Sequence, residues 1–124
     1  MRAKILIVDD EPNLLRLLEY NLNEKFEVIL KNDGAEALQW LHEGNIPNLV
    51  VTDVTMRAMD GSELLENIRK DPGLDKVPVI FLTAKSPCVD AIHTLIDAAD
   101  DYIVKPFDIE ELITSIENFL PTAV

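Results

Sequence analysis

Hydrophobic stretches of two kinds alternate along the chain and predict alternating strands and helices. Runs of Val, Ile, Leu and Phe too short for a helix predict five strands, at residues 4–8, 26–30, 49–51, 77–82 and 102–104. After each run, apolar residues recur at helical spacing and predict five helices, at residues 12–25, 35–42, 60–70, 89–99 and 108–120. The pattern is a strand–helix unit repeated five times.

The predicted strands are apolar along their whole length, which indicates a parallel sheet covered by helices on both faces. Right-handed crossovers favour a doubly wound α/β sheet, whose site lies beyond the carboxyl ends of the strands. The length of 124 residues suits one domain with a real hydrophobic core. We assign residues 1–120 to this domain and 121–124 to a short tail.

Polar residues mark the carboxyl ends of four predicted strands. Asp9 and Asp10 follow the first strand, Asp53 the third, Thr83 the fourth and Lys105 the fifth. Three carboxylates at close quarters repel one another unless a cation lies between them, and Mg²⁺ or Mn²⁺ suits such oxygen ligands. With an ammonium and a hydroxyl nearby, the set fits phosphoryl transfer, in which a carboxylate can be the nucleophile.

Each of these residues also has an ordinary structural explanation. Asp9 and Asp10 could cap a helix, and Asp53 could stabilise a turn. Thr83 alone could be a strand-end threonine, and Lys105 a surface lysine before a proline turn. Complementary chemistry at four strand ends favours the functional interpretation.

Five separated blocks resemble the receiver domain of two-component response regulators. They are residues 5–12 (ILIVDDEP), 53–56 (DVTM), 59–61 (MDG), 82–85 (LTAK) and 99–107 (ADDYIVKPF). The resemblance covers essentially the whole chain, with the blocks in the order of that family. It implies a flavodoxin-like fold with strand order 2-1-3-4-5.

The resemblance also implies a role for each acidic residue of the site. Asp53 is the expected phosphoacceptor, which takes a phosphoryl group from a histidine kinase or a histidine phosphotransfer protein. Asp9, Asp10 and Asp53 are the expected Mg²⁺ ligands, together with the main-chain carbonyl of Thr55. The chain is then a phosphoacceptor that assists its own phosphorylation and dephosphorylation, not an enzyme with a separate substrate.

Other residues are expected to sense the phosphoryl group. By the resemblance, Thr83, the amide of Ala84 and Lys105 bind its oxygens, and Tyr102 is the switch aromatic. The Lys105–Pro106 bond is expected to be cis. The signal would then reach a partner through the face formed by residues 89–99, 102–104 and the last helix.

Two positions depart from the usual pattern of the family, and two others are expected to affect the rate of dephosphorylation. Arg57 stands where the family usually has proline, and Ala98 replaces a usual glycine. Thr55 and Lys85 flank the site where the family varies, and they are expected to tune dephosphorylation.

Charge restricts the partners. With 23 acidic and 11 basic residues, the formal net charge is −12, which disfavours direct binding to nucleic acid or to an anionic membrane. No apolar run is long enough for a membrane span, no signal peptide is evident, and Cys88 is the only cysteine. We therefore expect a cytoplasmic protein.

The two docking surfaces can be anticipated. Between residues 86 and 124, Lys105 is the only Lys or Arg, against eight acidic residues. This composition argues against a dimer held by acid–base pairs, predicts a monomer or weak dimer, and favours a target with a basic or apolar surface. Leu14 and Leu17, one helical turn apart beside Asp10, are the candidates for docking the phosphodonor.

Several alternatives stay open. The chain is either a stand-alone regulator or a receiver from a longer one with a DNA-binding or enzymatic output domain, and a phosphorylation-independent interaction module is a further possibility. A haloacid-dehalogenase-like phosphatase needs an acid where Thr55 stands. A flavodoxin-like electron carrier needs a first loop rich in Ser, Thr and Gly, where this chain has residues 9–11 (DDE).

Overall fold

A parallel five-stranded sheet organises the computed structural model, which describes residues 2–54, 59–83 and 99–120. The strands are β1 (Lys4–Val8), β2 (Glu27–Lys31), β3 (Leu49–Asp53), β4 (Val79–Thr83) and β5 (Asp101–Val104). Their order in the sheet is β2-β1-β3-β4-β5, and every pairing is parallel. The predicted flavodoxin-like fold and its strand order are confirmed.

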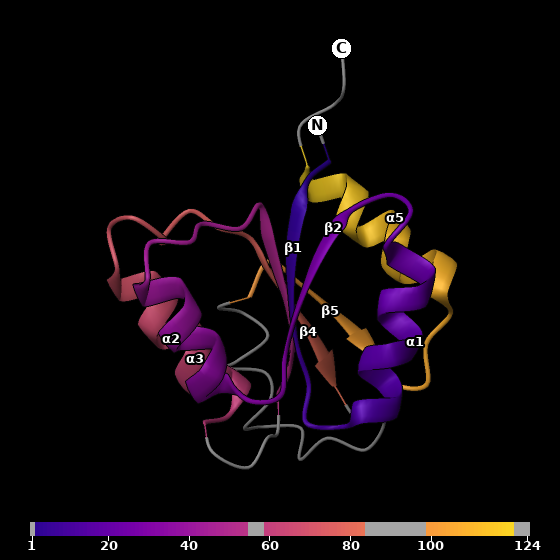
Figure 1. Cartoon of the computed structure of the whole chain (residues 1–124), viewed down its shortest axis with the longest axis horizontal. Coiled ribbons are helices and arrows are strands. Elements are labelled where there is room, and N and C mark those ends of the chain that lie inside the picture. Colours follow the sequence, from indigo (N-terminus) through magenta and orange to yellow (C-terminus); the bar gives the residue numbers. More distant parts are fainter. Residues whose placement is uncertain (1, 55–58, 84–98, 121–124) are drawn as a thin grey trace.

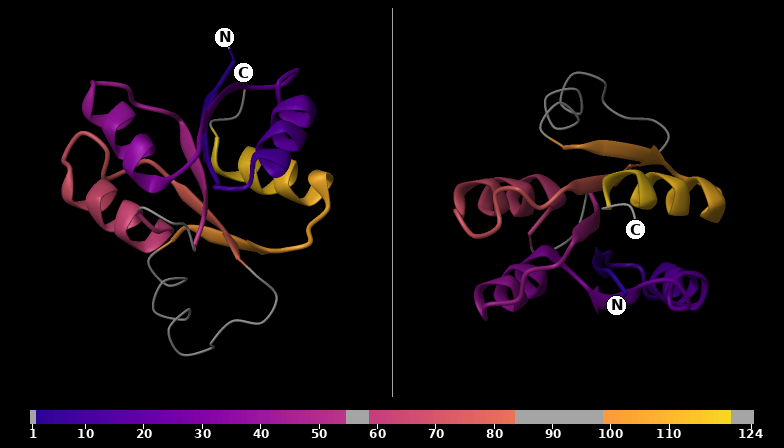
Figure 2. Two further views of the ribbon diagram at one scale, coloured as in Figure 1. Left: turned by 60° about the horizontal axis from the view of Figure 1, so that its bottom comes forward. Right: turned by 90° about the horizontal axis from the view of Figure 1, so that it is seen from above.

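Helices cover both faces of the sheet. In the described residues they are α1 (Pro12–Leu22), α2 (Gly34–His42), α3 (Gly61–Lys70) and α5 (Ile109–Phe119). Figure 1 shows α2 and α3 on one side of the strands and α1 and α5 on the other, and Figure 2 shows the same two layers from further directions. The helix predicted at 89–99 falls almost entirely outside the described residues.

The alternation of side chains along each strand divides the core into two layers. In β1, Ile5 and Ile7 join the cluster formed with α1 and α5, whereas Leu6 and Val8 join the cluster formed with α2 and α3. All four side chains are fully buried. Because both faces of the central strands are covered, these strands are apolar throughout and not alternately polar.

The expectation that every strand is buried on both faces is wrong for the two outer strands. β2 is only partly buried, and in β5 Tyr102 and Val104 are 45% and 40% exposed. Each outer strand has a neighbour on one side only, and hydrophobic composition alone does not reveal which strands lie at the edge.

For the elements that the structure describes, the predicted boundaries are correct to within a few residues. Phe26 was expected in the second strand, but its N–H bonds the carbonyl of Leu22 and closes the turn after α1. The fourth strand was expected from Val77 and begins at Val79, directly after Pro78, which has no N–H to donate.

The register brings the carboxyl ends of the strands to one edge of the sheet. Val8 pairs with Thr52, and Asp53 pairs with Leu82. Thr83 pairs with Val104, the residue before Lys105. The polar residues that follow β1, β3, β4 and β5 therefore meet at this edge. None of the described helices is long and apolar enough to cross a membrane.

Hydrogen bonds of Asp100 hold the start of β5 at the edge of the sheet opposite the carboxyl ends of the strands. The carboxylate of Asp100 accepts hydrogen bonds from the N–H of Val79 and from the Arg69 guanidinium, both at 2.8 Å. Arg69 also donates to the carbonyls of Asp75 and Val77. These bonds tie the end of α3 and the start of β4 to the start of β5, and so help to set where Lys105 emerges.

Candidate functional site

Three carboxylates lie together at the carboxyl edge of the sheet. Asp9 follows β1 and is fully buried, while Asp10 and Asp53 are partly buried. One oxygen from each of the three side chains lies within 4.8 Å of the others. The predicted convergence of these residues is thus found, and their oxygens form a set of hard ligands of the kind that binds Mg²⁺.

The ammonium of Lys105 joins two of the carboxylates. Its Nζ lies 3.1 Å from Asp9 Oδ2 and 3.3 Å from Asp53 Oδ2. The Lys105 side chain is 25% exposed, compared with 1% for Asp9 and 15% for Asp53. Among the described residues, the cluster joins three acidic groups, Asp10 included, and the basic group of Lys105.

The carboxylates also act on the protonation of Lys105. Partial burial by itself lowers the pKa of the ammonium, but the negative charge of Asp53 and the hydrogen bond and charge of Asp9 outweigh burial. The pKa of Lys105 is therefore raised above its ordinary value of 10.5. Lys105 is held in its charged form where it can meet an incoming anion.

Backbone contacts orient Asp9. Its Oδ1 accepts a hydrogen bond from the N–H of Glu11 at 2.9 Å, and its own N–H donates to the carbonyl of Lys31. Pro12 begins α1 immediately afterwards, at a position where its missing N–H costs nothing. One Asp9 oxygen is thus fixed by the loop, and the other is directed at Lys105.

Gly61 supports the backbone of Asp53 from the other side. Its N–H donates to the carbonyl of Val54 at 2.8 Å. A Cβ at position 61 would lie 2.3 Å from the carbonyl oxygen of Asp53. Asp60 caps the helix there, accepting a hydrogen bond from the N–H of Glu63. We expected the helix start from the Asp60–Gly61 pair, but the sequence gives no sign of this close approach to Asp53.

Thr83 and Lys105 are neighbours through their backbones. Thr83 ends β4 with 3% of its surface exposed, and its carbonyl accepts the N–H of Lys105 at 2.7 Å. The Lys105–Pro106 peptide bond is cis, the form that the family resemblance implies. This hydrogen bond joins the end of β4 to the residue that follows β5.

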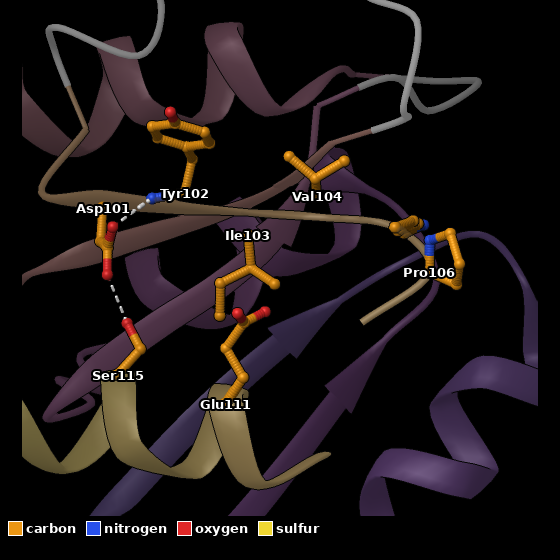
Figure 3. A pocket seen from close by; sticks show the side chains of 8 residues that line it. Asp101, Tyr102, Ile103, Val104, Pro106, Glu111 and Ser115 are labelled. Atoms are coloured by element: carbon orange, nitrogen blue, oxygen red, sulfur yellow. Dashed lines mark hydrogen bonds between the residues drawn. The ribbon is translucent and has the colours of Figure 1, made fainter. Parts of the chain in front are cut away.

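Tyr102 lies on β5, away from the carboxylate cluster. Its N–H donates to the carboxylate of Asp101 at 2.8 Å. Figure 3 shows Tyr102 and Val104 on one side of the strand and Glu111 and Ser115 on the other. The Tyr102 ring is exposed, so a change in the conformation of β5 would alter its surroundings.

Several other predicted site residues can be located only in part. Thr55, Ala84 and Lys85 lie outside the described residues, as do the unusual Arg57 and Ala98, so their predicted roles stay predictions. On α1, Leu14 is partly buried against the core and Leu17 is 50% exposed. Of the two, Leu17 is the more exposed.

Comparison with known proteins shows the family to which the chain is similar. Residues 5–117 match the family model described as the response regulator receiver domain. The DNA-binding response regulator MtrA of Mycolicibacterium smegmatis is 38% identical over 117 residues, which are 94% of this chain and 50% of that protein. The response regulator ArlR of Staphylococcus saprophyticus is 41% identical over 119 residues, which are 95% of this chain and 52% of that protein.

A solved structure gives the same assignment. The response regulator TrrA of Thermotoga maritima, in complex with Mg²⁺-BeF, superposes with a TM-score of 0.82 at 34% identity, covering 95% of this chain and 99% of that chain. The chain belongs to the family of response regulator receiver domains. It spans about half the length of the curated relatives that it matches.

Replacing Gly61 by Ala should destabilise the fold at the site. The new methyl group meets the Asp53 carbonyl, and relieving such overpacking costs about 1–3 kcal/mol. The free energy of unfolding from urea titration measures this loss. Gly73→Ala is the matched control, because its Cβ would find its nearest neighbour at 3.4 Å. Equal effects of the two substitutions would contradict the close packing against Asp53.

Replacing Lys105 by Met should lower the free energy of unfolding at neutral pH by about 1–3 kcal/mol, since the buried Asp9 carboxylate loses its charged partner. Urea titration of both proteins measures the difference. Lys70→Met is the control, because Lys70 pairs with Glu66 only at the exposed surface, and a loss of similar size there would argue against a special role for Lys105.

The same pair of proteins should show a defined pH dependence. The pKa of Lys105 is higher in the folded state, so its stabilising contribution is complete below pH 10.5 and is lost as pH rises through the folded-state pKa. As pH is raised from neutrality, the difference in free energy of unfolding between wild type and Lys105→Met should therefore narrow only at alkaline pH. If the difference in free energy of unfolding already narrows as pH rises through neutrality, the raised pKa of Lys105 is contradicted.

Proposed function

We propose that this chain is a phosphorylation-activated receiver in which Asp53 accepts a phosphoryl group from a histidine kinase or a histidine phosphotransfer protein. The observation that carries the proposal is the Lys105 ammonium shared by Asp9 and Asp53, 3.1 and 3.3 Å from their Oδ2 atoms, within a cluster of three carboxylates. Phosphoryl transfer requires a nucleophile, positive charge and fixed orientation in one place, and this cluster supplies them.

The reaction is a displacement at phosphorus. A carboxylate oxygen of Asp53 forms the new O–P bond while the P–N bond of the donor phosphohistidine breaks. The bonding electrons go to the imidazole nitrogen of the donor, and the product is an acyl phosphate on Asp53. Lys105, released from the carboxylate that has reacted, is placed to bind an oxygen of the transferred group.

The carboxylates suit a divalent cation as cofactor. Asp9, Asp10 and Asp53 would hold Mg²⁺, because their carboxylate oxygens already lie together and are the hard ligands that this ion prefers. When bound, the ion supplies positive charge for the phosphoryl oxygens. The relative TrrA, solved with Mg²⁺-BeF, supports this choice.

The switch follows from the added charge. Phosphorylation brings about 1.5 to 2 negative charges and three acceptor oxygens to the edge of the sheet. The hydroxyl of Thr83 and the ammonium of Lys105 then gain new partners, and both residues are joined to β5 through the Thr83–Lys105 backbone bond. Movement of β5 changes the surroundings of the exposed Tyr102, which makes β5 and α5 the face that a target reads.

The target is a protein surface or an attached domain. MtrA is described as a DNA-binding response regulator and is about twice as long as this chain, so output through a DNA-binding partner or domain is consistent with the relatives. The net charge of −12 disfavours contact between this domain and nucleic acid. Signal output is therefore a protein contact in either arrangement.

Asp53→Asn should abolish phosphorylation. Wild type incubated with acetyl phosphate and Mg²⁺ is expected to gain one phosphoryl group by intact mass, and the gain should disappear with the variant or with chelator. Asp33→Asn is the matched control, because this residue caps α2 outside the cluster and Asn caps equally well.

Two results would overturn the proposal. One is a phosphoryl gain on Asp53→Asn equal to that of wild type. The other is no gain on folded wild type with any small phosphodonor, which would leave a phosphorylation-independent interaction module.

Leu17→Ala should slow transfer from a protein donor without affecting the chemistry at Asp53. Leu17 is 50% exposed on α1, so its loss removes contact area without opening the core, and we expect a decrease of about two- to ten-fold in the transfer rate. A phosphorylated histidine kinase that transfers to wild type provides the assay, and acetyl phosphate provides the comparison.

Ile46→Ala is the control for an exposed apolar residue. Ile46 is 60% exposed and precedes β3, at the opposite edge of the sheet from the site. It should leave both rates unchanged. Equal losses with kinase and with acetyl phosphate in Leu17→Ala would argue against docking at α1.

A further inference from the structure

A groove follows β5 at the outer edge of the sheet. It encloses about 650 Å³ and is lined by Asp101, Tyr102, Ile103, Val104, Lys105, Pro106, Glu111 and Ser115. Figure 3 shows it between the strand and the first turns of α5. Six of these residues come from β5 and the cis-proline turn, so the occupant of the groove would contact the strand that the site controls.

The free edge of β5 is closed to an added strand at its start. Because the N–H of Lys105 points to β4, the backbones of Tyr102 and Val104 point to the other side. The N–H of Tyr102 is taken by Asp101 Oδ1, and Asp101 Oδ2 accepts the Ser115 hydroxyl at 2.5 Å. Pairing with Tyr102 would break this arrangement, so the groove is read mainly through side chains.

The groove has an apolar part and an acidic part. Tyr102 and Val104 are 45% and 40% exposed on one side of β5. On the other side lie the carboxylates of Asp101 and Glu111. Among the described residues, no basic side chain pairs with Glu111.

Acidic residues outnumber basic ones in the part of the chain that forms the groove. Residues 99–120 include six acidic side chains and one basic side chain, Lys105. The ammonium of Lys105 is directed to Asp9 and Asp53 in the neighbouring site. A second copy of this surface would bring acid against acid, and a nucleic acid would bring phosphate against acid.

We propose that this groove binds a basic segment of a partner protein. An Arg or Lys of the segment lies between Asp101 and Glu111, and an apolar side chain crosses the edge of β5 to contact Tyr102 and Val104. The inference rests on the proposed function, because it names the class of target that the switched face selects. It adds to the proposed function that the partner segment is basic.

Peptide binding to the whole chain tests the proposal. The probe is a fluorescein-labelled peptide of alternating Arg and Leu, and the matched peptide has Glu in place of Arg. Fluorescence anisotropy at low and at moderate salt should show binding of the basic peptide, weakened by salt, and none of the acidic one. Binding of both peptides alike, or of neither, would overturn the proposal.

Two charge variants on the same helix localise the binding. Glu111→Gln should lower the affinity for the basic peptide about two- to five-fold, the range expected for one partly exposed ion pair. Glu117→Gln removes the same charge from an exposed position of α5 that does not line the groove, and should have no measurable effect. Equal weakening by both would mean diffuse attraction to an acidic surface and would overturn the assigned groove.

Failure of this proposal can be separated from failure of the proposed function. The peptide is titrated without any phosphodonor and again with Asp53→Asn, and both proteins should bind it. Binding without any phosphoryl gain on wild type would count against the function alone, while a phosphoryl gain without binding would count against the groove alone. Tight binding of a DNA duplex, or a dimer formed through α5, would also overturn the choice of partner.

Discussion

The shared ammonium of Lys105 is the contact on which the rest of the site depends. Asp9 is fully buried, and a buried carboxylate is costly unless a charge or hydrogen bonds compensate it. Lys105 follows β5, which lies three places from β1 and two from β3 in the sheet, and it reaches both Asp9 and Asp53. The position of β5 along the sheet is therefore restricted at both ends, by Lys105 at one edge and by the bonds of Asp100 at the other.

The sequence predicts the fold and the core of the site for the same reason. Parallel strands covered on both faces must be apolar throughout, and their carboxyl ends must meet at one edge, so Asp9, Asp53 and Lys105 converge by topology alone. The family resemblance adds the strand order and the roles. The close approach of Gly61 to Asp53 and the Asp101–Ser115 bond have no such pattern, because each depends on the packing of elements far apart in the chain. The exposure of Tyr102 depends likewise on which strand lies at the edge.

The few positive charges near β5 have structural uses. Arg69, near the end of α3, donates hydrogen bonds to the Asp100 carboxylate and to two backbone carbonyls. Lys105 forms ion pairs with the carboxylate cluster. Of the described acidic residues that line the groove, neither Asp101 nor Glu111 has a basic partner. Basic side chains of the described residues thus do not neutralise the acidic excess of this region, and a partner with complementary charge can do so.

Site and groove share one short strand, which makes their energies interdependent. Lys105 lines the groove and also contacts Asp9 and Asp53, while its N–H bonds the carbonyl of Thr83. A phosphoryl group on Asp53 and a basic segment in the groove would both act on the conformation of the four residues of β5. If phosphorylation favours the form that binds the partner, thermodynamic linkage requires the partner to favour phosphorylation by the same factor. The partner surface is then part of the phosphorylation equilibrium, not only its recipient.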